Sequence, residues 1–270
     1  MISEYMCRRR LLIILLLLVG LHAYGQLPLP LLPPTLTRPA DRADYLAVHF
    51  YDGMDWNDPV MTSSENMMQD WANFLSVLPH CSPEGRDSAI VSMIHSIPAS
   101  LVPVYADMAD GYLFATDSEL CDEVEYLKVL NALATHPAVN EAYRSGLVSR
   151  LGYLSKCAPG TTAADIIVES LDGTAEYSLG SLRGMADEIL LVFYDPDCED
   201  CHAVLDELAN GICWKSLTTS GKLIVVKAEI TDETDALYPI LTVPSLYHLS
   251  GAGLEVKARN IPLSDLRLMP

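Results

Sequence analysis

Two cysteines three residues apart stand in the stretch FYDPDCEDCH, residues 193–202, directly behind an apolar run. Cys198 and Cys201 could form a redox-active dithiol, half of a metal site, or an inert structural disulfide. A cysteine acts as a nucleophile or a metal ligand only after it has lost its proton. The choice among the three therefore depends on the charges near the two sulfurs and on the elements that hold them.

Charged side chains surround the pair. Asp197 precedes Cys198, and Glu199 and Asp200 separate the two cysteines. Each carboxylate near Cys198 opposes a second negative charge by about 1 kcal/mol in exposed surroundings, although acids also complement the positive end of a helix dipole. We expect the three acids to tune the dithiol away from strong oxidising power, because strong oxidants stabilise their thiolate.

His202, next to Cys201, has two interpretations. It could transfer a proton to or from the sulfurs, or it could be an ordinary solvated residue. Neighbours in a helix do not share a face, which favours the solvated residue.

The flanking pattern predicts the elements that hold the cysteines. Residues 188–194 (EILLVFY) form a continuous apolar run, as in a central strand covered on both faces. A helical pattern follows at once, then a second buried strand at 222–230 and a closing hairpin at 245–249 and 254–260. Cys198 would then lie in the first helical turn, where unpaired N–H groups stabilise a thiolate. We expect exposed Cys198 to attack a disulfide and sheltered Cys201 to resolve it.

A second signal lies in TVPSLYHL, where Val243 and Pro244 precede a predicted strand. Strand, CxxC, helix, strand, then Val-Pro before a strand resembles the thioredoxin fold. The resemblance implies a cis Pro244 that faces the cysteines, and a Val243 whose backbone binds an extended peptide substrate.

A closer resemblance is to secreted bacterial thioredoxin-like proteins of the thiol:disulfide interchange type. A subset of these carries a helical domain of unknown function, which residues 42–59 (RADYLAVHFYDGMDWNDP) resemble. Thioredoxin has Trp where this chain has Asp197 and Gly-Pro where it has Glu199-Asp200, and two further departures remove an acid. The buried acid six residues before the first cysteine is replaced by Val192, and the glutamate six residues after it by Val204. The usual internal proton acceptor for the resolving thiol is therefore missing.

The start of the chain indicates export. Arg8, Arg9 and Arg10 precede the apolar run LLIILLLLVG, and small residues follow at Ala23 and Gly25, as in a signal peptide. An uncleaved anchor is the alternative, but about 18 apolar residues are needed to span a bilayer and this run is shorter. We predict a signal peptide at 1–25 and a periplasmic or cell-envelope location. A proline-rich linker at 26–40 would act as an extended tether that could keep the protein near the membrane.

The remainder divides into two predicted domains, a helical domain at 41–157 and a thioredoxin-like domain at 158–270. Two capping-box spacings, Thr62-x-x-Glu65 and Thr116-x-x-Glu119, precede apolar runs with helical periodicity. The Trp56, Trp71 and Met67-Met68 side chains are interpreted as core and lid residues rather than as a cofactor site. The predicted class is α+β, with an all-α N-terminal domain ahead of an α/β domain built on a mixed sheet.

Charge and cysteine content restrict the remaining functions. The net charge of −19 disfavours nucleic acid and anionic lipid, which proteins bind through Lys and Arg. A zinc site would need two ligands besides the cysteine pair, and only Cys213, His202 and His248 are near, so no metal is predicted. An inert disulfide remains open, because exported proteins use disulfides freely. The four other mature cysteines are expected to be buried free thiols: Cys81, Cys121, Cys157 and Cys213.

The resemblance implies an exported thiol-disulfide oxidoreductase, working reductively on protein disulfides of the cell envelope. Its partners would be protein thiols and disulfides, with a membrane reductant donor, and it would need no cofactor. The alternative function is a non-catalytic module that binds a protein or peptide through the same fold.

Overall fold

The computed structural model describes residues 27–261; the predicted signal peptide lies outside them. The chain forms two compact units. The first runs up to Leu113 and resumes over Lys128–Arg144, and the second comprises Phe114–Leu127 and everything from Ser145 onward.

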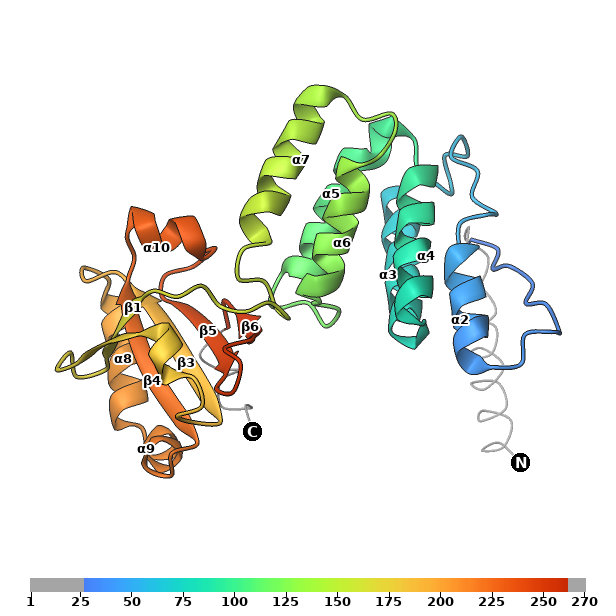
Figure 1. Ribbon diagram of the computed structural model, residues 1–270. Helices are drawn as coiled ribbons and strands as arrows, with labels where there is room; N and C mark the ends of the chain where they lie inside the picture. The colour runs from blue at the N-terminus through green and yellow to red at the C-terminus, as the bar shows by residue number, and fades with distance from the viewer. Residues whose placement is uncertain (1–26, 262–270) are drawn as a thin grey trace, which may run out of the picture. The chain divides into compact units, whose positions relative to one another are not determined.

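The first unit is helical, as predicted. Its helices are α2 (Pro39–Val48), α3 (Ser64–Val77), α4 (Pro83–Ser96) and α5 (Val102–Ala109), and parts of α6 (Glu123–Ala134) and α7 (Glu141–Leu154) (Figure 1). Pro39 occupies the first turn of α2, where its missing N–H costs nothing. The last two residues of the predicted linker, Pro39 and Ala40, thus lie in α2.

Aromatic side chains form the core of the first unit. Trp71, Phe74 and Tyr105 are fully buried, and the Trp71 and Tyr105 rings meet edge to face at 5.5 Å. Met67 is buried as well, whereas Met68 is exposed. Trp71 and Met67 are thus core residues, in agreement with the sequence interpretation.

The two predicted capping boxes are wrong in position. The N-cap of α3 is Ser63, whose hydroxyl accepts from the Asn66 N–H, while Thr62 donates to the Asp58 carbonyl instead. The stretch after Thr116 does not continue into a helix. Helix α6 begins later, where the Asp122 carboxylate accepts from the Glu125 N–H at 3.0 Å. Several polar side chains near each helix start could serve as caps, and sequence spacing alone does not choose among them.

The second unit is built on a six-stranded mixed sheet. Its strands are β1 (Ile167–Ser170), β2 (Glu176–Ser178), β3 (Glu188–Tyr194), β4 (Leu223–Glu229), β5 (Ser245–Ser250) and β6 (Val256–Arg259), in the order β2-β1-β4-β3-β5-β6. β3 and β4 are parallel, and the other neighbours are antiparallel. The predicted central strand, second strand and hairpin are confirmed, and so is the α+β class.

Central strand β3 is covered on both faces. Ile189, Leu191 and Phe193 pack into one apolar cluster, and Leu190 and Val192 pack into another together with Leu208 and Trp214. Leu208 belongs to α8 (Glu199–Asn210), which runs beside the sheet in Figure 1, and Trp214 belongs to α9 (Ile212–Thr219), at the lower end of the strands in that view. A short helix, α10 (Asp232–Leu237), follows β4. Burial on two faces explains the unbroken apolar run.

Within residues 27–261, no single helix is both long enough and apolar enough to cross a membrane. α4 and the stretch Ala99–Phe114 meet the length and composition criteria only as a pair, bent by 108°.

Candidate functional site

The dithiol lies at the start of α8, shortly after the end of β3. Cys198 is the N-cap of α8, with extended backbone angles, and its sulfur accepts a hydrogen bond from the Cys201 N–H at 3.1 Å. An N-cap side chain faces the unpaired N–H groups of the first turn. The helix start therefore directs N–H groups toward the half-exposed Cys198 sulfur.

Cys201 has different surroundings. Its side chain is fully buried, and burial raises the pKa of its thiol to about 11, with a further upward contribution from Cys198 and an opposing one from the backbone of Asp195. Both cysteines are thiols in this structure. At neutral pH the buried sulfur keeps its proton, so the two positions differ in exposure and in chemistry.

The sequence-predicted acids surround the motif at the surface. Asp197, Glu199 and Asp200 are all exposed, and so is Asp195, whose carboxylate accepts from the Asp197 N–H at 2.8 Å. His202 is exposed beside buried Cys201, so the two side chains occupy different faces of α8. This arrangement favours the solvated interpretation of His202.

Apolar side chains occupy the two positions where the related proteins carry an acid. Val192 is fully buried in β3, and Val204 is half-buried on α8. Neither can accept a proton from Cys201.

Strand register places Pro244 at the same end of the sheet as the cysteines. Phe193 in β3 pairs with Ser245 in antiparallel β5. The residues after Phe193 and those before Ser245 therefore leave the sheet together, which brings Val243 and Pro244 to the motif's end of the sheet. The Val243–Pro244 peptide bond is cis, and Val243 is exposed.

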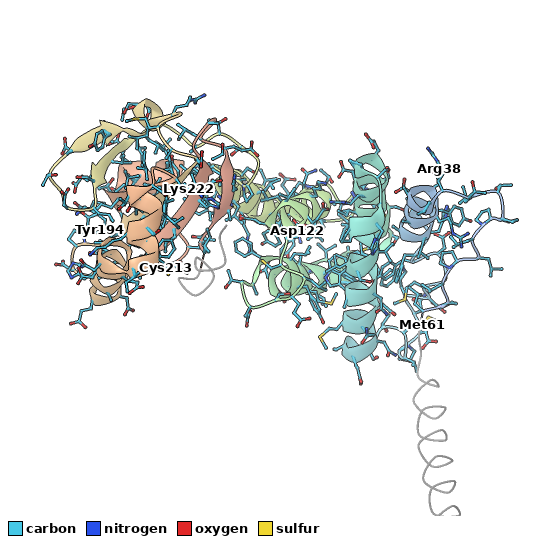
Figure 2. All side chains as sticks on the ribbon, turned by 90° about the horizontal axis from the view of Figure 1, so that it is seen from below. Arg38, Met61, Asp122, Tyr194, Cys213 and Lys222 are labelled. Atoms are coloured by element: carbon cyan, nitrogen blue, oxygen red, sulfur yellow. The ribbon has the colours of Figure 1, made fainter. Side chains whose placement is uncertain are left out.

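The remaining cysteines divide into two kinds. Cys81 and Cys157 are buried, and the Cys157 sulfur accepts from the Ala164 N–H at 3.3 Å. Cys121 and Cys213 are exposed, with Cys213 in α9 (Figure 2). All four are free thiols. The expectation of burial is therefore wrong for these last two, because Cys121 lies in the irregular stretch ahead of α6 and Cys213 in the first turn of α9 rather than on a packed face.

Among residues 27–261, no group of three or more His, Cys, Asp or Glu side chains is placed to hold a metal ion. His248, a candidate zinc ligand in the sequence, instead hydrogen-bonds the Glu188 carboxylate at 2.8 Å. Burial lowers the pKa of His248, and the charge of Glu188 opposes that shift.

Sequence reasoning missed one component close to the site. The buried Arg259 guanidinium pairs with Glu123 and donates to the backbone carbonyls of Leu154 and Lys156. The ion pair joins β6 to the first residue of α6, 136 residues away in the chain. Neither segment has a local sequence pattern that predicts the Glu123–Arg259 ion pair.

Comparison with solved structures defines the fold class. A thioredoxin-like protein from Bacteroides caccae ATCC 43185 superposes with a TM-score of 0.70 and 24% identity, over 89% of this chain and 96% of that one. The fold is therefore thioredoxin-like. A thiol-disulfide oxidoreductase from Bacteroides fragilis NCTC 9343 matches 40% of this chain and 95% of its own, at 20% identity and a TM-score of 0.26. The exposed lipoprotein thioredoxin of Streptococcus pneumoniae strain TIGR4 matches 39% of this chain and 100% of its own, at 18% sequence identity and a TM-score of 0.26.

The N-terminal half identifies the family. Residues 19–156 match DUF5106, a domain of unknown function, and the chain belongs to that family. No curated protein matches the chain. The resemblance to thioredoxin-like proteins that carry a helical domain of unknown function is confirmed.

Proposed function

We propose that this protein is an exported thiol-disulfide oxidoreductase that reduces protein disulfides through Cys198 and Cys201. The observation that carries the proposal is the contrast between the two sulfurs. Cys198 is partly exposed and faces the N–H groups at the start of α8, whereas Cys201 is fully buried with a pKa raised to about 11. A reactive outer thiol and a protonated inner thiol suit a two-step exchange.

In the first step the Cys198 thiolate attacks one sulfur of the substrate disulfide. The substrate S–S bond breaks, a mixed disulfide forms on Cys198, and the departing sulfur takes up a proton. Cys201 then gives its proton to solvent and attacks the Cys198 sulfur, which releases the second substrate thiol. Two electrons pass to the substrate, and Cys198 and Cys201 end as a disulfide that an external dithiol, on a membrane reductant donor, reduces again.

The reductive direction is supported by the charges near the motif. Asp197, Glu199 and Asp200 are exposed beside Cys198, and no cationic side chain stands within the motif. Strong oxidants gain their power from a stabilised thiolate in the reduced form, which added negative charge opposes. The cis peptide at Pro244 and the exposed Val243 would bind the substrate backbone, as in the proteins that the chain resembles.

Export is supported by the leader-like pattern at residues 1–25, outside the described residues. Protein purified from the cell-envelope fraction should have its N-terminus near Gln26. Intact mass and N-terminal sequencing would measure this, and a full-length chain in the cytoplasmic fraction would contradict export.

Insulin reduction by dithiothreitol tests the activity. The assay should use a Cys121→Ser/Cys213→Ser background, because these two exposed thiols could otherwise exchange on their own. In that background the protein should accelerate insulin precipitation, and adding Cys198→Ser should abolish the acceleration. Equal rates with and without Cys198 would contradict the oxidoreductase and leave the non-catalytic binding module.

A further inference from the structure

A cavity of about 500 Å³ opens in the second unit beside Pro244. Its walls come from four stretches of the chain: residues 114–123, helix α8, the residues that lead into and begin β5, and the end of β6 with the two residues after it. They include Phe114, Cys121, Val204, Leu241, Pro244 and Leu246. The volume lies within the range of about 300–1,000 Å³ that is usual for ligand pockets.

The cavity lies on the reactive side of α8. Val204 follows Cys201 by three residues, so the two side chains lie on one face of the helix. Pro244 leaves the sheet at the same end as the motif, because Phe193 pairs with Ser245. A molecule that fills the cavity would therefore lie at the end of the sheet that carries the dithiol.

The wall contributed by the DUF5106 part of the chain is firmly held. The Phe114 ring stacks on Tyr126 at 4.5 Å, and the Arg150 guanidinium lies 5.5 Å from the Tyr126 ring. Glu123 pairs with buried Arg259. The wall is thus a fixed surface of the second unit.

The chemistry of the lining selects an apolar occupant. Glu123 and Arg259 are the two charged side chains in it, and they neutralise each other. The rest is mainly aliphatic or aromatic, and Leu241 is 41% exposed at the surface. Burying apolar groups of a ligand against such walls contributes about 25 cal/mol per Å².

Exposed acids lie on two of the stretches that line the cavity. Asp117, Glu119 and Asp122 are exposed between residues 114 and 123 (Figure 2 labels Asp122), and Glu199 and Asp200 are exposed at the start of α8. Complementary charge on a partner would speed its encounter and fix its register. An apolar stretch flanked by Lys or Arg fits both the apolar walls and these acids.

We infer that this cavity binds a polypeptide stretch that carries bulky apolar side chains flanked by basic residues. In its link to catalysis the inference rests on the proposed function: the bound stretch is the part of the substrate next to its disulfide. The DUF5106 segment at Phe114–Glu123 thereby acts as a specificity element for the dithiol.

Direct binding tests this without exchange at the exposed cysteines. The protein should carry Cys198→Ser and Cys201→Ser in the Cys121→Ser/Cys213→Ser background, and the probes are fluorescent disulfide-cyclised peptides that differ only beside one cysteine. One carries Leu and Phe flanked by Lys, a second carries two Ser flanked by Lys, and a third carries Leu and Phe flanked by Glu. Fluorescence anisotropy should show the first binding at least tenfold more tightly than either of the others.

A matched pair of variants locates the binding. Leu241→Asp puts a charge into the cavity wall, and should abolish the preference for the first peptide. Leu237→Asp is the control, since Leu237 has similar exposure (38% against 41%) and lies outside the lining; it should leave the preference intact. Equal binding of the first two peptides, or equal effects of the two variants, would overturn the inference.

Failure of peptide binding can be told apart from failure of the proposed oxidoreductase activity. If the protein with its cysteines intact reduces neither insulin nor a small aromatic disulfide, the oxidoreductase fails, while the anisotropy experiment still decides whether the cavity binds the peptide. If reduction works, Leu241→Asp should raise KM for the first peptide about tenfold, with a smaller effect on the Ser peptide.

Discussion

Cys198 and Cys201 lie within one turn of each other at the start of α8, and burial of Cys201 is the largest cause of its raised pKa. Moving a thiol away from water penalises its charged form, so the buried sulfur holds its proton to higher pH. The acids that normally assist such a thiol are replaced by Val192 and Val204. Solvent must then take the proton from Cys201 directly.

The resolving step should therefore depend steeply on pH. With the Cys201 pKa raised to about 11, the thiolate fraction grows about tenfold for each pH unit from 6 to 10. The test starts from a mixed disulfide of Cys198 with thionitrobenzoate, in the Cys121→Ser/Cys213→Ser background. The rate at which Cys201 releases the thionitrobenzoate should rise about tenfold for each pH unit, and stopped-flow absorbance measures it.

A rate that levels off near pH 7 would contradict this dependence and would indicate a nearby base. Cys201→Ser provides the blank, because it should hold the mixed disulfide without intramolecular release.

In the helical unit, Asp70 is a second buried titratable residue. It is 4% exposed, and its Oδ2 atom has no hydrogen-bond partner among the described residues. Burial raises the pKa of Asp70, while a hydrogen bond from the backbone of Leu27 opposes the shift. The fold therefore favours the protonated carboxyl, and ionising it costs stability.

Asp70→Asn should stabilise the protein at pH 7. Because the folded-state pKa is raised, the ionised carboxylate destabilises the fold at neutral pH, and the cost disappears as pH falls toward the unfolded-state value. The gain in unfolding free energy should be about 1.4 kcal/mol for each unit by which the pKa is raised, and should vanish near pH 3. Urea unfolding at both pH values measures it.

Exposed Asp107 on α5 supplies the control, and Asp107→Asn should change stability by less than about 0.5 kcal/mol. If Asp70→Asn is neutral or destabilising at pH 7, the carboxylate is not the unfavourable group that its burial implies.

Among the secondary-structure elements, the start of α6 depends on one side chain. Asp122 accepts from the Glu125 N–H, and it lies in the segment that forms one wall of the cavity. Asp122→Ala should lower the unfolding free energy by about 0.5–2 kcal/mol, the usual cost of losing a cap, and Asp122→Asn should retain most of it. Thermal unfolding followed by circular dichroism compares the two, and equal losses would show that the charge rather than the cap is responsible.

Strands were easier to predict than helix starts. The predicted strand at 188–194 coincides with β3 because burial on two faces leaves an unbroken apolar run, and the motif at the next helix start follows from it. The start of α6 could not be predicted, since Thr116 and Asp122 are both suitable caps. The cavity wall was missed for another reason: the Glu123–Arg259 contact spans 136 residues, and a single sequence carries no sign of such a pairing.

In the whole molecule, the Glu123–Arg259 pair ties two distant parts of the sequence into one unit. Arg259 is fully buried in its side chain, and removing one partner of a buried pair leaves an uncompensated charge. Glu123→Ala should therefore lower the unfolding free energy by about 3–5 kcal/mol, and Glu123→Leu/Arg259→Met should recover much of the loss.

The matched comparison is a partly exposed ion pair, formed by Lys257 on β6 with Glu188. Its 2.7 Å contact is partly hydrated, so Lys257→Met should cost no more than about 1 kcal/mol. Similar losses for Glu123→Ala and Lys257→Met in urea unfolding would mean that burial does not govern the strength of these ion pairs.

The division of the chain into units limits where it can be truncated. The backbone passes between the units three times, after Leu113, after Leu127 and after Arg144, and both α6 and α7 are shared. A fragment that begins at Ser145 would lack residues 114–127, which belong to the same unit as the dithiol. A fragment that keeps this unit whole has to begin at or before Phe114 and must therefore carry both shared helices.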